Sequence, residues 1–216
     1  MDIEYFGHSC FRITTNGGTT VLTDPYTKVG YELPANLSSE IVTVSHGHFD
    51  HNYLGFVKNN AVIINTTQTF SYKDVKITGT ETYHDPFCGK LRGKNIVYTI
   101  QADGITVCHL GDLGEACSEN VLAKIGKVDV LFIPIGGTYT IDAQQAKEYI
   151  FALKPKIVIP MHYRPKDGTL DIDGAEMFLQ LLQDKVVYIN PKNRLSGVEK
   201  HITEGETKIV FMEKEP

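Results

Sequence analysis

The chain has 216 residues, of which 42% are hydrophobic and 22% charged, and its formal net charge is −5. This composition excludes an intrinsically disordered chain, and an acidic chain without a run of Lys or Arg is not expected to bind nucleic acid. A membrane span is excluded as well, because the most apolar run, residues 128–135, contains Asp129 and Pro134 and is too short. We expect a single domain over residues 1–216, long enough to fold without a metal or a disulfide.

The first residues and the cysteines indicate the compartment. Asp2 and Glu4 stand where a signal peptide would carry basic residues, so export is not expected. The cysteines are scattered, without a Cys-x-x-Cys pair, at Cys10, Cys88, Cys108 and Cys117. This spacing is typical of ordinary thiols in a reducing compartment. We therefore expect a cytoplasmic protein.

The first half of the chain is predicted to be rich in strands. Short runs of β-branched and aromatic residues predict strands at 3–6, 10–14, 20–23, 41–44, 62–65, 75–78, 96–101 and 105–110. Two turn sequences, Asn16-Gly17-Gly18 and Ala102-Asp103-Gly104, indicate hairpins between neighbouring strands. A short helix is expected over residues 52–58.

The second half alternates strands and helices. Buried strands are predicted at 128–134 and 157–161, and closing strands at 186–189 and 208–212. One helix should run from about 142 to 153, with Asp142 as its N-cap and Lys154-Pro155 as its stop. Asp173 is predicted to cap a second helix, with Glu176 completing a capping box. The residues expected to face inward from that helix are Met177, Leu181 and Leu182.

The strongest motif is His46-Gly47-His48-Phe49-Asp50-His51, directly after the predicted strand 41–44. In extended chain His46 and His48 point to one side and can bind one cation, while Asp50 and His51 can reach a second cation from the following turn. Imidazole and carboxylate ligands suit zinc, iron or manganese. The alternative is a surface segment rich in histidine, but Gly47 also allows a tight ligating turn.

Three later residues can complete two coordination spheres. His84, Asp112 and His162 each follow a predicted strand, and Gly111 allows a sharp turn before Asp112. The carboxyl ends of strands are where open α/β sheets gather their ligands. Each residue alone is more often structural. Together with the first motif they supply five histidines and two aspartates, enough for two metals that share Asp112.

In order and spacing, these residues resemble the metal ligands of the metallo-β-lactamase superfamily. The similarity extends to Tyr5-Phe6-Gly7-His8-Ser9, Leu22-Thr23-Asp24-Pro25-Tyr26, Arg92-Gly93-Lys94-Asn95, His109-Leu110-Gly111-Asp112, Pro134-Ile135-Gly136-Gly137-Thr138-Tyr139-Thr140 and Pro160-Met161-His162-Tyr163. These segments resemble a branch of metal-dependent hydrolases akin to ascorbate-6-phosphate lactonase, and they cover residues 2 to about 185. The resemblance implies an α/β fold of four layers, the αββα sandwich, with two mixed β-sheets flanked by helices and the metals in a groove at one edge.

The resemblance also implies how the ligands are shared. One metal would take His46, His48 and His84, the other would take Asp50, His51 and His162, and Asp112 would bridge them. Asp24 resembles an aspartate that supports the ligand loop through hydrogen bonds, and such carboxylates orient ligating imidazoles. The alternative for Asp24 is the cap of a turn before Pro25.

For two further residues, the sequence allows either a contact with the substrate or a structural role. His8 matches the pattern of the branch, and the alternative is a structural histidine near the sheet edge. Thr138 could place its hydroxyl near a substrate in the groove, although a turn at the end of a strand is the preferred interpretation. His109 is expected next to the ligands or in the core.

The expected function is hydrolysis of an ester, lactone or phosphodiester bond in a small-molecule substrate. Two divalent ions, zinc first and manganese or iron next, would activate a bridging hydroxide as nucleophile, and Asp50 would orient it and shuttle its proton. The alternative is a non-catalytic metal-binding protein, or a redox protein with two irons, that keeps the same ligand set. A homo-oligomer is left open.

Overall fold

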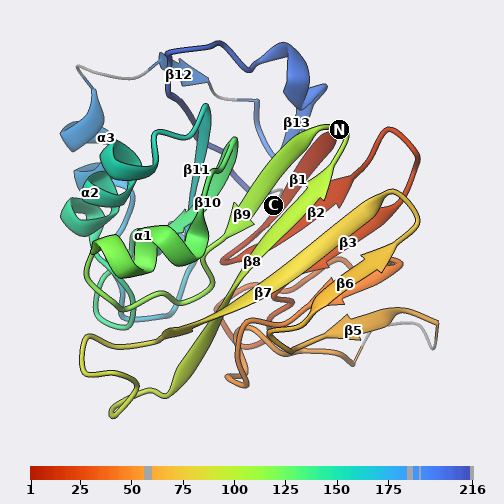
Figure 1. Cartoon of the computed structure of the whole chain (residues 1–216). Coiled ribbons are helices and arrows are strands. Elements are labelled where there is room, and N and C mark those ends of the chain that lie inside the picture. The colour runs from red at the N-terminus through yellow and green to blue at the C-terminus, as the bar shows by residue number, and fades with distance from the viewer. Residues whose placement is uncertain (56–59, 184–186, 190, 215–216) are drawn as a thin grey trace.

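A computed structural model describes residues 1–55, 60–183, 187–189 and 191–214. In these residues two mixed β-sheets pack face to face, and the α-helices lie together beside β10 (Val130–Pro134) and β11 (Ile157–Met161) (Figure 1). In sheet order, the six-stranded sheet contains β13 (Arg194–Ser196), β1 (Asp2–Gly7), β2 (Cys10–Thr14), β3 (Thr20–Thr23), β4 (Ile41–Thr43) and β5 (Val62–Ile64). The eight-stranded sheet contains β12 (Val187–Ile189), β14 (Lys208–Val210), β11 (Ile157–Met161), β10 (Val130–Pro134), β9 (Ile105–His109), β8 (Lys94–Ala102), β7 (Val75–Tyr83) and β6 (Thr69–Tyr72). The predicted fold class is confirmed.

The core lies between the two sheets. Alternate residues of the antiparallel strands β1 and β2 point inward, among them Tyr5, Phe11 and Ile13. The ring of Phe11 stacks on Phe132 of β10 in the other sheet, with 4.1 Å between ring centroids. This contact joins the two sheets close to the edge at which the strands of the candidate site end.

The strands β10 and β11 are buried along their whole length. Both strands pair with parallel neighbours on either side. One face of each strand packs on the other sheet and the opposite face packs on the helices, so both faces carry apolar residues. The helices are α1 (Glu119–Ile125), α2 (Ala143–Leu153) and α3 (Glu176–Leu182), with a short 3₁₀-helix at Val198–Lys200. None of the helices in the described ranges is long and apolar enough to span a membrane.

The outer face of the six-stranded sheet has a different cover. Leu22 and Val42 point away from the core between the sheets and pack against Tyr26, Val29 and Leu37. The predicted helix over 52–58 is not found at 52–55, and 56–58 lie outside the described residues. Among the described residues this layer is therefore irregular chain rather than helix.

The hairpin of β7 and β8 is longer than its sequence predicted. The ladder pairs residues from Lys76 with Gln101 to Tyr83 with Lys94, so the strands extend well beyond 75–78 and 96–101. Continuous pairing satisfies the backbone donors and acceptors of both strands. As a result β7 ends directly before His84, which places that residue at the sheet edge.

The helix ends test the capping predictions. The side chain of Asp142 accepts a bond from the amide of Gln145, the Gln145 side chain accepts from the amide of Asp142, and the helix ends at the left-handed Lys154 as predicted. The cap predicted at Asp173 is wrong, because α3 starts three residues later at Glu176 and its N-cap, Ala175, offers no side-chain bond. The Asp173 backbone instead bonds to Gly136 and Arg164.

This later start also changes the buried face of α3. Phe178 and Leu182, four residues apart, are buried, and Leu181 is half-buried. Met177 was predicted to face inward, but it is 57% exposed. The prediction was wrong because the helix packs on the stripe that contains Phe178.

Candidate metal centre

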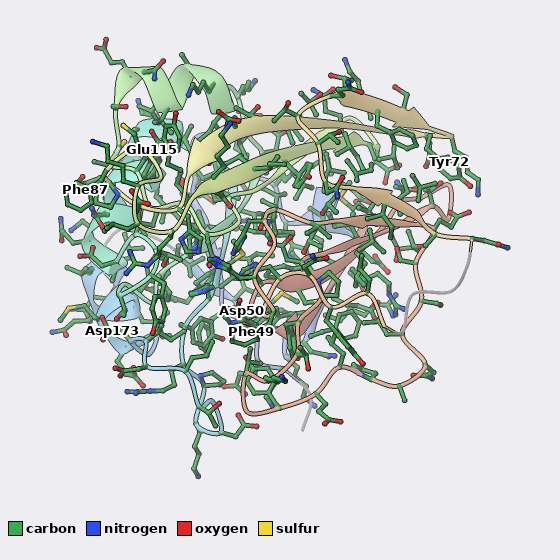
Figure 2. The ribbon with its side chains drawn as sticks, turned by 90° about the horizontal axis from the view of Figure 1, so that it is seen from below. Phe49, Asp50, Tyr72, Phe87, Glu115 and Asp173 are labelled. Carbon is green, nitrogen blue, oxygen red and sulfur yellow. The ribbon has the colours of Figure 1, made fainter. Side chains whose placement is uncertain are left out.

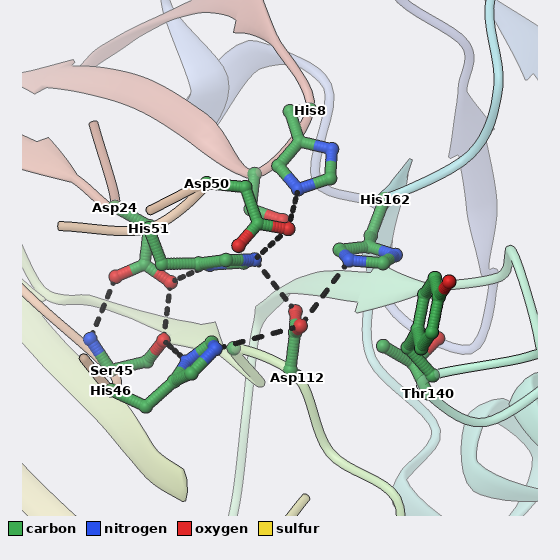
Figure 3. A network of polar contacts seen from close by, with 12 residues as sticks. His8, Asp24, Ser45, His46, Asp50, His51, Asp112, Thr140 and His162 are labelled. Carbon is green, nitrogen blue, oxygen red and sulfur yellow. Dashed lines mark hydrogen bonds and ion pairs between the residues drawn. The ribbon is translucent and has the colours of Figure 1, made fainter. Parts of the chain in front are cut away.

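The candidate site lies where strands of both sheets end. Asp24 follows β3, the segment 45–51 follows β4, and His84 follows β7. Asp112 comes three residues after β9, and His162 directly follows β11. Figure 3 shows the labelled side chains of His46, His51 and His162, from separate segments, directed toward Asp112. The structure thus brings together all seven residues that the sequence proposed as ligands.

Asp112 is at the centre of this cluster. Its Oδ1 lies 3.0 Å from Nε2 of His51, and its Oδ2 lies 3.1 Å from Nε2 of His84 and 3.2 Å from Nε2 of His162. Nε2 of His46 lies 3.7 Å from Oδ2. A single buried carboxylate therefore faces four imidazoles through their Nε2 atoms.

The other donors form two groups on either side of Asp112. The open half consists of His46, His48 and His84, whose donor atoms lie within 4.8 Å of one another, and His48 is exposed. The buried half consists of Asp50, His51 and His162, whose donors meet the same limit together with His8. Two neighbouring cations could each be held by one half and share Asp112.

Several buried polar atoms of the cluster lack a hydrogen-bond partner. They are Nε2 of His46, Nε2 of His51, both ring nitrogens of His162, and Oδ1 of Asp112. Buried polar atoms are normally satisfied, and lone pairs that face one another need a cation between them. The donor set therefore fits divalent metal ions.

Hydrogen bonds at Nδ1 fix three of the imidazoles. His84 Nδ1 lies 3.0 Å from the carbonyl oxygen of Tyr139, which can only accept, so this nitrogen donates. His51 Nδ1 lies 2.7 Å from Oδ2 of Asp24, and His46 Nδ1 lies 2.9 Å from Oγ of Ser45. Because the Ser45 hydroxyl donates to Asp24, its oxygen accepts from His46. In the neutral rings these bonds leave the Nε2 lone pairs directed at Asp112.

Asp24 supports the ligand segment, residues 45–51, through hydrogen bonds. This fully buried carboxylate accepts from the amide of Ser45 at 2.8 Å, from the Ser45 hydroxyl at 2.5 Å and from His51. Its φ of 36° lies in the left-handed region, which is costly for a side chain other than glycine. A cap of the turn before Pro25 would not need these contacts, so the geometry favours the supporting role.

Asn95 holds the backbone of Asp112. Its Oδ1 accepts from the amide of Asp112 at 2.9 Å, and its Nδ2 donates to Thr82 and to the carbonyl of Leu110. Gly111 makes this possible, because its φ is 54° and a Cβ there would lie 2.4 Å from the Asn95 oxygen. Sequence reasoning included Asn95 only in a segment that resembles the family and gave it no role.

His8 joins the buried half from β1. Its Nε2 lies 3.2 Å from Oδ2 of Asp50, and its ring lies 4.3 Å from that of His162 between centroids. The residue has a left-handed φ of 52°, and its amide donates to the hydroxyl of Tyr31. Burial, with the neighbouring His162, lowers the pKa of His8 to about 4. A neutral His8 therefore donates to the Asp50 carboxylate.

The charges in the cluster follow from burial and proximity. Burial lowers the pKa of His46 to about 3, so its ring is neutral near pH 7. Burial opposes ionisation of Asp112, but the imidazoles of His162 and His51 outweigh it and hold the pKa of this carboxyl well below its usual range. Burial likewise opposes ionisation of Asp50, and the hydrogen bond from His8 outweighs it, so the pKa of Asp50 is lowered. Burial opposes protonation of His51, but the carboxylates of Asp112 and Asp24 outweigh it and hold the pKa of this ring well above its usual range. Positive charge is thus favoured among these carboxylates, as a site for cations requires.

The two remaining candidates lie apart from the ligand atoms. His109 is buried between Ser9 and Gly111: its Nε2 donates to the Ser9 carbonyl, and its Nδ1 accepts from the amide of Gly111. It therefore belongs to the core. Thr138 has a left-handed φ of 51° in a turn at the end of β10, in which the amide of Thr140 donates to the carbonyl of Gly137. Thr138 borders a pocket beside the centre.

Comparison with known proteins places this geometry in a family. The model of the β-lactamase superfamily domain matches residues 2–162. The crystal structure of a candidate zinc-dependent hydrolase of the metallo-β-lactamase superfamily from Thermotoga maritima is 38% identical, covers 98% of each chain and has a TM-score of 0.79. A UPF0173 metal-dependent hydrolase of Thermoplasma volcanium is 30% identical over 82% of this chain and 88% of its own. A UPF0173 metal-dependent hydrolase of Thermoplasma acidophilum is 28% identical over 77% and 85%. The chain therefore belongs to the metallo-β-lactamase superfamily, as one of its metal-dependent hydrolases.

Proposed function

We propose that the protein hydrolyses an ester, lactone or phosphodiester bond of a small molecule with two divalent cations, one in each half of the centre. The observation that supports this most is the set of unpaired lone pairs around Asp112, because atoms of both halves contribute to it. A one-metal site would leave one group of three donors without a function.

In this proposal the open half holds one cation through His46, His48 and His84. The buried half holds the other through Asp50, His51 and His162, and Asp112 binds both. Zinc is the proposed metal, since imidazole nitrogen and carboxylate oxygen are its common ligands, and the same donors also accept manganese or iron.

When bound, the cations supply a water of lowered pKa and polarise the oxygen of the bond to be cleaved. Asp50 is the proposed proton acceptor in this reaction. Its carboxylate is partly exposed, lies 3.8 Å from Nε2 of His51 and is held on one oxygen by His8. It can therefore take up a proton at the centre and release it to solvent.

Two buried residues are proposed to position the ligands. Asp24 orients His51 and fixes the ligand segment through the amide and hydroxyl of Ser45. His8 orients Asp50 through its Nε2. For Thr138 the turn geometry supports a structural role. The cytoplasmic location and any homo-oligomer stay predictions.

The test is a screen of the zinc-loaded protein against lactones, phosphodiesters and thioesters, with Asp112→Ala as the matched control. We expect at least one class to be hydrolysed at a rate that a chelator abolishes and added zinc restores. If the fully loaded protein turned over no member of these classes, the non-catalytic alternative would be favoured instead.

A further inference from the structure

A pocket of about 320 Å³ lies beside the open half of the centre. We define this side pocket by Phe87, Leu91, Arg92, Thr138 and Tyr139, which border it. Tyr139 connects it to the centre, because its carbonyl oxygen holds Nδ1 of His84. In Figure 2 the labelled Phe87 lies to one side of Asp50 and Phe49, which mark the ligand segment. The side pocket and the surroundings of His84 therefore share Tyr139.

The wall of the side pocket is fixed before any ligand binds. The carboxylate of Asp85 accepts hydrogen bonds of 2.8–3.0 Å from the amides of Phe87, Gly89, Leu91 and Arg92. Four amides on one carboxylate hold the loop in one shape. A pre-formed pocket loses less conformational freedom on binding and so binds more tightly.

The cationic side chain of Arg92 borders the side pocket. The guanidinium of Arg92 lies 5.4 Å from the ring centroid of Tyr139 and forms no ion pair with any carboxylate of the described residues. The acid that borders the pocket, Asp142, already accepts from the amide of Gln145 at the start of α2. Arg92 is thus free to bind an external anion.

The rest of the lining is apolar and exposed. Phe87 is 57% exposed, Leu91 is 65% exposed and Tyr139 is 38% exposed, so these side chains offer surface that a ligand can cover. With a net charge of −5, the chain as a whole repels anions, so an anion bound here needs a local cationic partner such as Arg92. The guanidinium fork matches a carboxylate or a phosphate with two hydrogen bonds.

We infer that the side pocket binds an anionic group of the substrate, a carboxylate or a phosphate, through Arg92. The hydrocarbon or ring next to that group packs on Phe87, Leu91 and Tyr139. This inference deepens the proposed function and rests on it: the cleaved bond lies at the centre and the charged end lies on the side of His84, away from Asp50.

The first experiment measures binding of small anions to the protein and does not depend on catalytic turnover. Benzoate, phenyl phosphate and neutral benzyl alcohol are titrated into the zinc-loaded protein and followed by NMR, for wild type, Arg92→Gln, Arg92→Lys and Lys90→Gln. Lys90 is exposed in the same loop but does not border the pocket, so Lys90→Gln removes the same charge elsewhere. Anions that bind only to zinc would be unaffected by any of these substitutions.

We expect Arg92→Gln to weaken binding of benzoate or phenyl phosphate by about tenfold to a hundredfold, the effect of losing a charge-assisted hydrogen bond. The affinity of Arg92→Lys for the anions should lie between those of wild type and Arg92→Gln, since lysine keeps the positive charge but lacks the two-pronged guanidinium. Lys90→Gln should stay within about twofold, and binding of benzyl alcohol should change in none of the variants. The anion that loses more affinity identifies whether carboxylate or phosphate is preferred.

The second experiment uses a substrate from the screen in two forms, with a free acid group and with that group as its methyl ester. Arg92→Gln should lower kcat/KM for the acid form about tenfold or more and leave the neutral form unchanged. Unaltered anion affinity in Arg92→Gln, with or without a lower melting temperature, would overturn the inference and leave the hydrolase proposal standing. Arg92-dependent binding without zinc-dependent hydrolysis would instead overturn the proposed function.

Discussion

The two halves of the centre differ in what surrounds their donor atoms. In the buried half, Asp24 and His8 hold His51 and Asp50 by hydrogen bonds, and one donor is itself a carboxylate. The open half consists of three imidazoles, and one of them, His48, is exposed. A pre-organised, anionic and desolvated site should hold a cation more tightly than a site of three imidazoles of which one is exposed. We therefore propose that the buried half retains its cation more tightly and that the open half faces the incoming substrate.

The largest expected effect comes from removing the residue that the halves share. Asp112→Ala should release both cations and lower turnover by at least ~10³-fold, the scale seen when a residue on which catalysis depends is deleted. Metal analysis together with kcat checks this. A variant that keeps two equivalents of zinc would show that Asp112 does not join the halves.

His48→Ala should affect the open half alone. The side chain is exposed, so we expect the stability of the metal-free protein to change by no more than about 0.5 kcal/mol. One zinc equivalent should be lost, one retained, and hydrolysis abolished. If both equivalents disappeared together, the halves would be one cooperative site rather than two.

Asp50→Asn changes charge and proton transfer with little change in volume. We expect turnover to fall by roughly 10²-fold or more, the usual contribution of a general base, while the melting temperature changes little. The measurement is kcat together with metal content. Full metal content with wild-type turnover would remove Asp50 from the mechanism, and loss of metal with loss of rate would support ligation alone.

Substitutions of Asp24 test whether its hydrogen bonds support the ligands of the buried half. Asp24→Asn should weaken zinc binding in that half about 10- to 100-fold, because the partner of a ligating imidazole is changed. Asp24→Ala should also destabilise the fold by about 3 kcal/mol, since it leaves buried donors of Ser45 and His51 unpaired. Zinc titration and thermal unfolding of both variants separate the two effects. Equal loss of affinity in the open half would contradict the asymmetry.

The candidate metal ligands could be proposed from the sequence because their signals are local. His46, His48, Asp50 and His51 lie within six residues, and the remaining ligands follow strands whose ends had to meet at a sheet edge. The superfamily and its two-sheet fold were likewise predicted and are confirmed.

The surroundings of the ligands were harder to predict, since they depend on long-range contacts. Asn95 meets Asp112 only because two hairpin strands lie side by side, and nothing in its neighbours indicates that role. Asp85 organises the loop of the side pocket through hydrogen bonds to its amides. The glycines that follow Asp85 in the sequence were the signal from which such a loop could have been predicted. At Asp173 a good local cap sequence was overridden, because its backbone bonds to Gly136 and Arg164 instead.

Our proposal is that two unequal cation sites joined by Asp112 carry out hydrolysis. Its most direct test is a calorimetric zinc titration of chelator-stripped protein, with the rate on a substrate from the screen measured at each point. We predict two binding steps of different affinity, no rate in the stripped protein, and full rate only when both sites are filled. A single equivalent at saturation, or full rate in the stripped protein, would rule out hydrolysis by two joined cation sites.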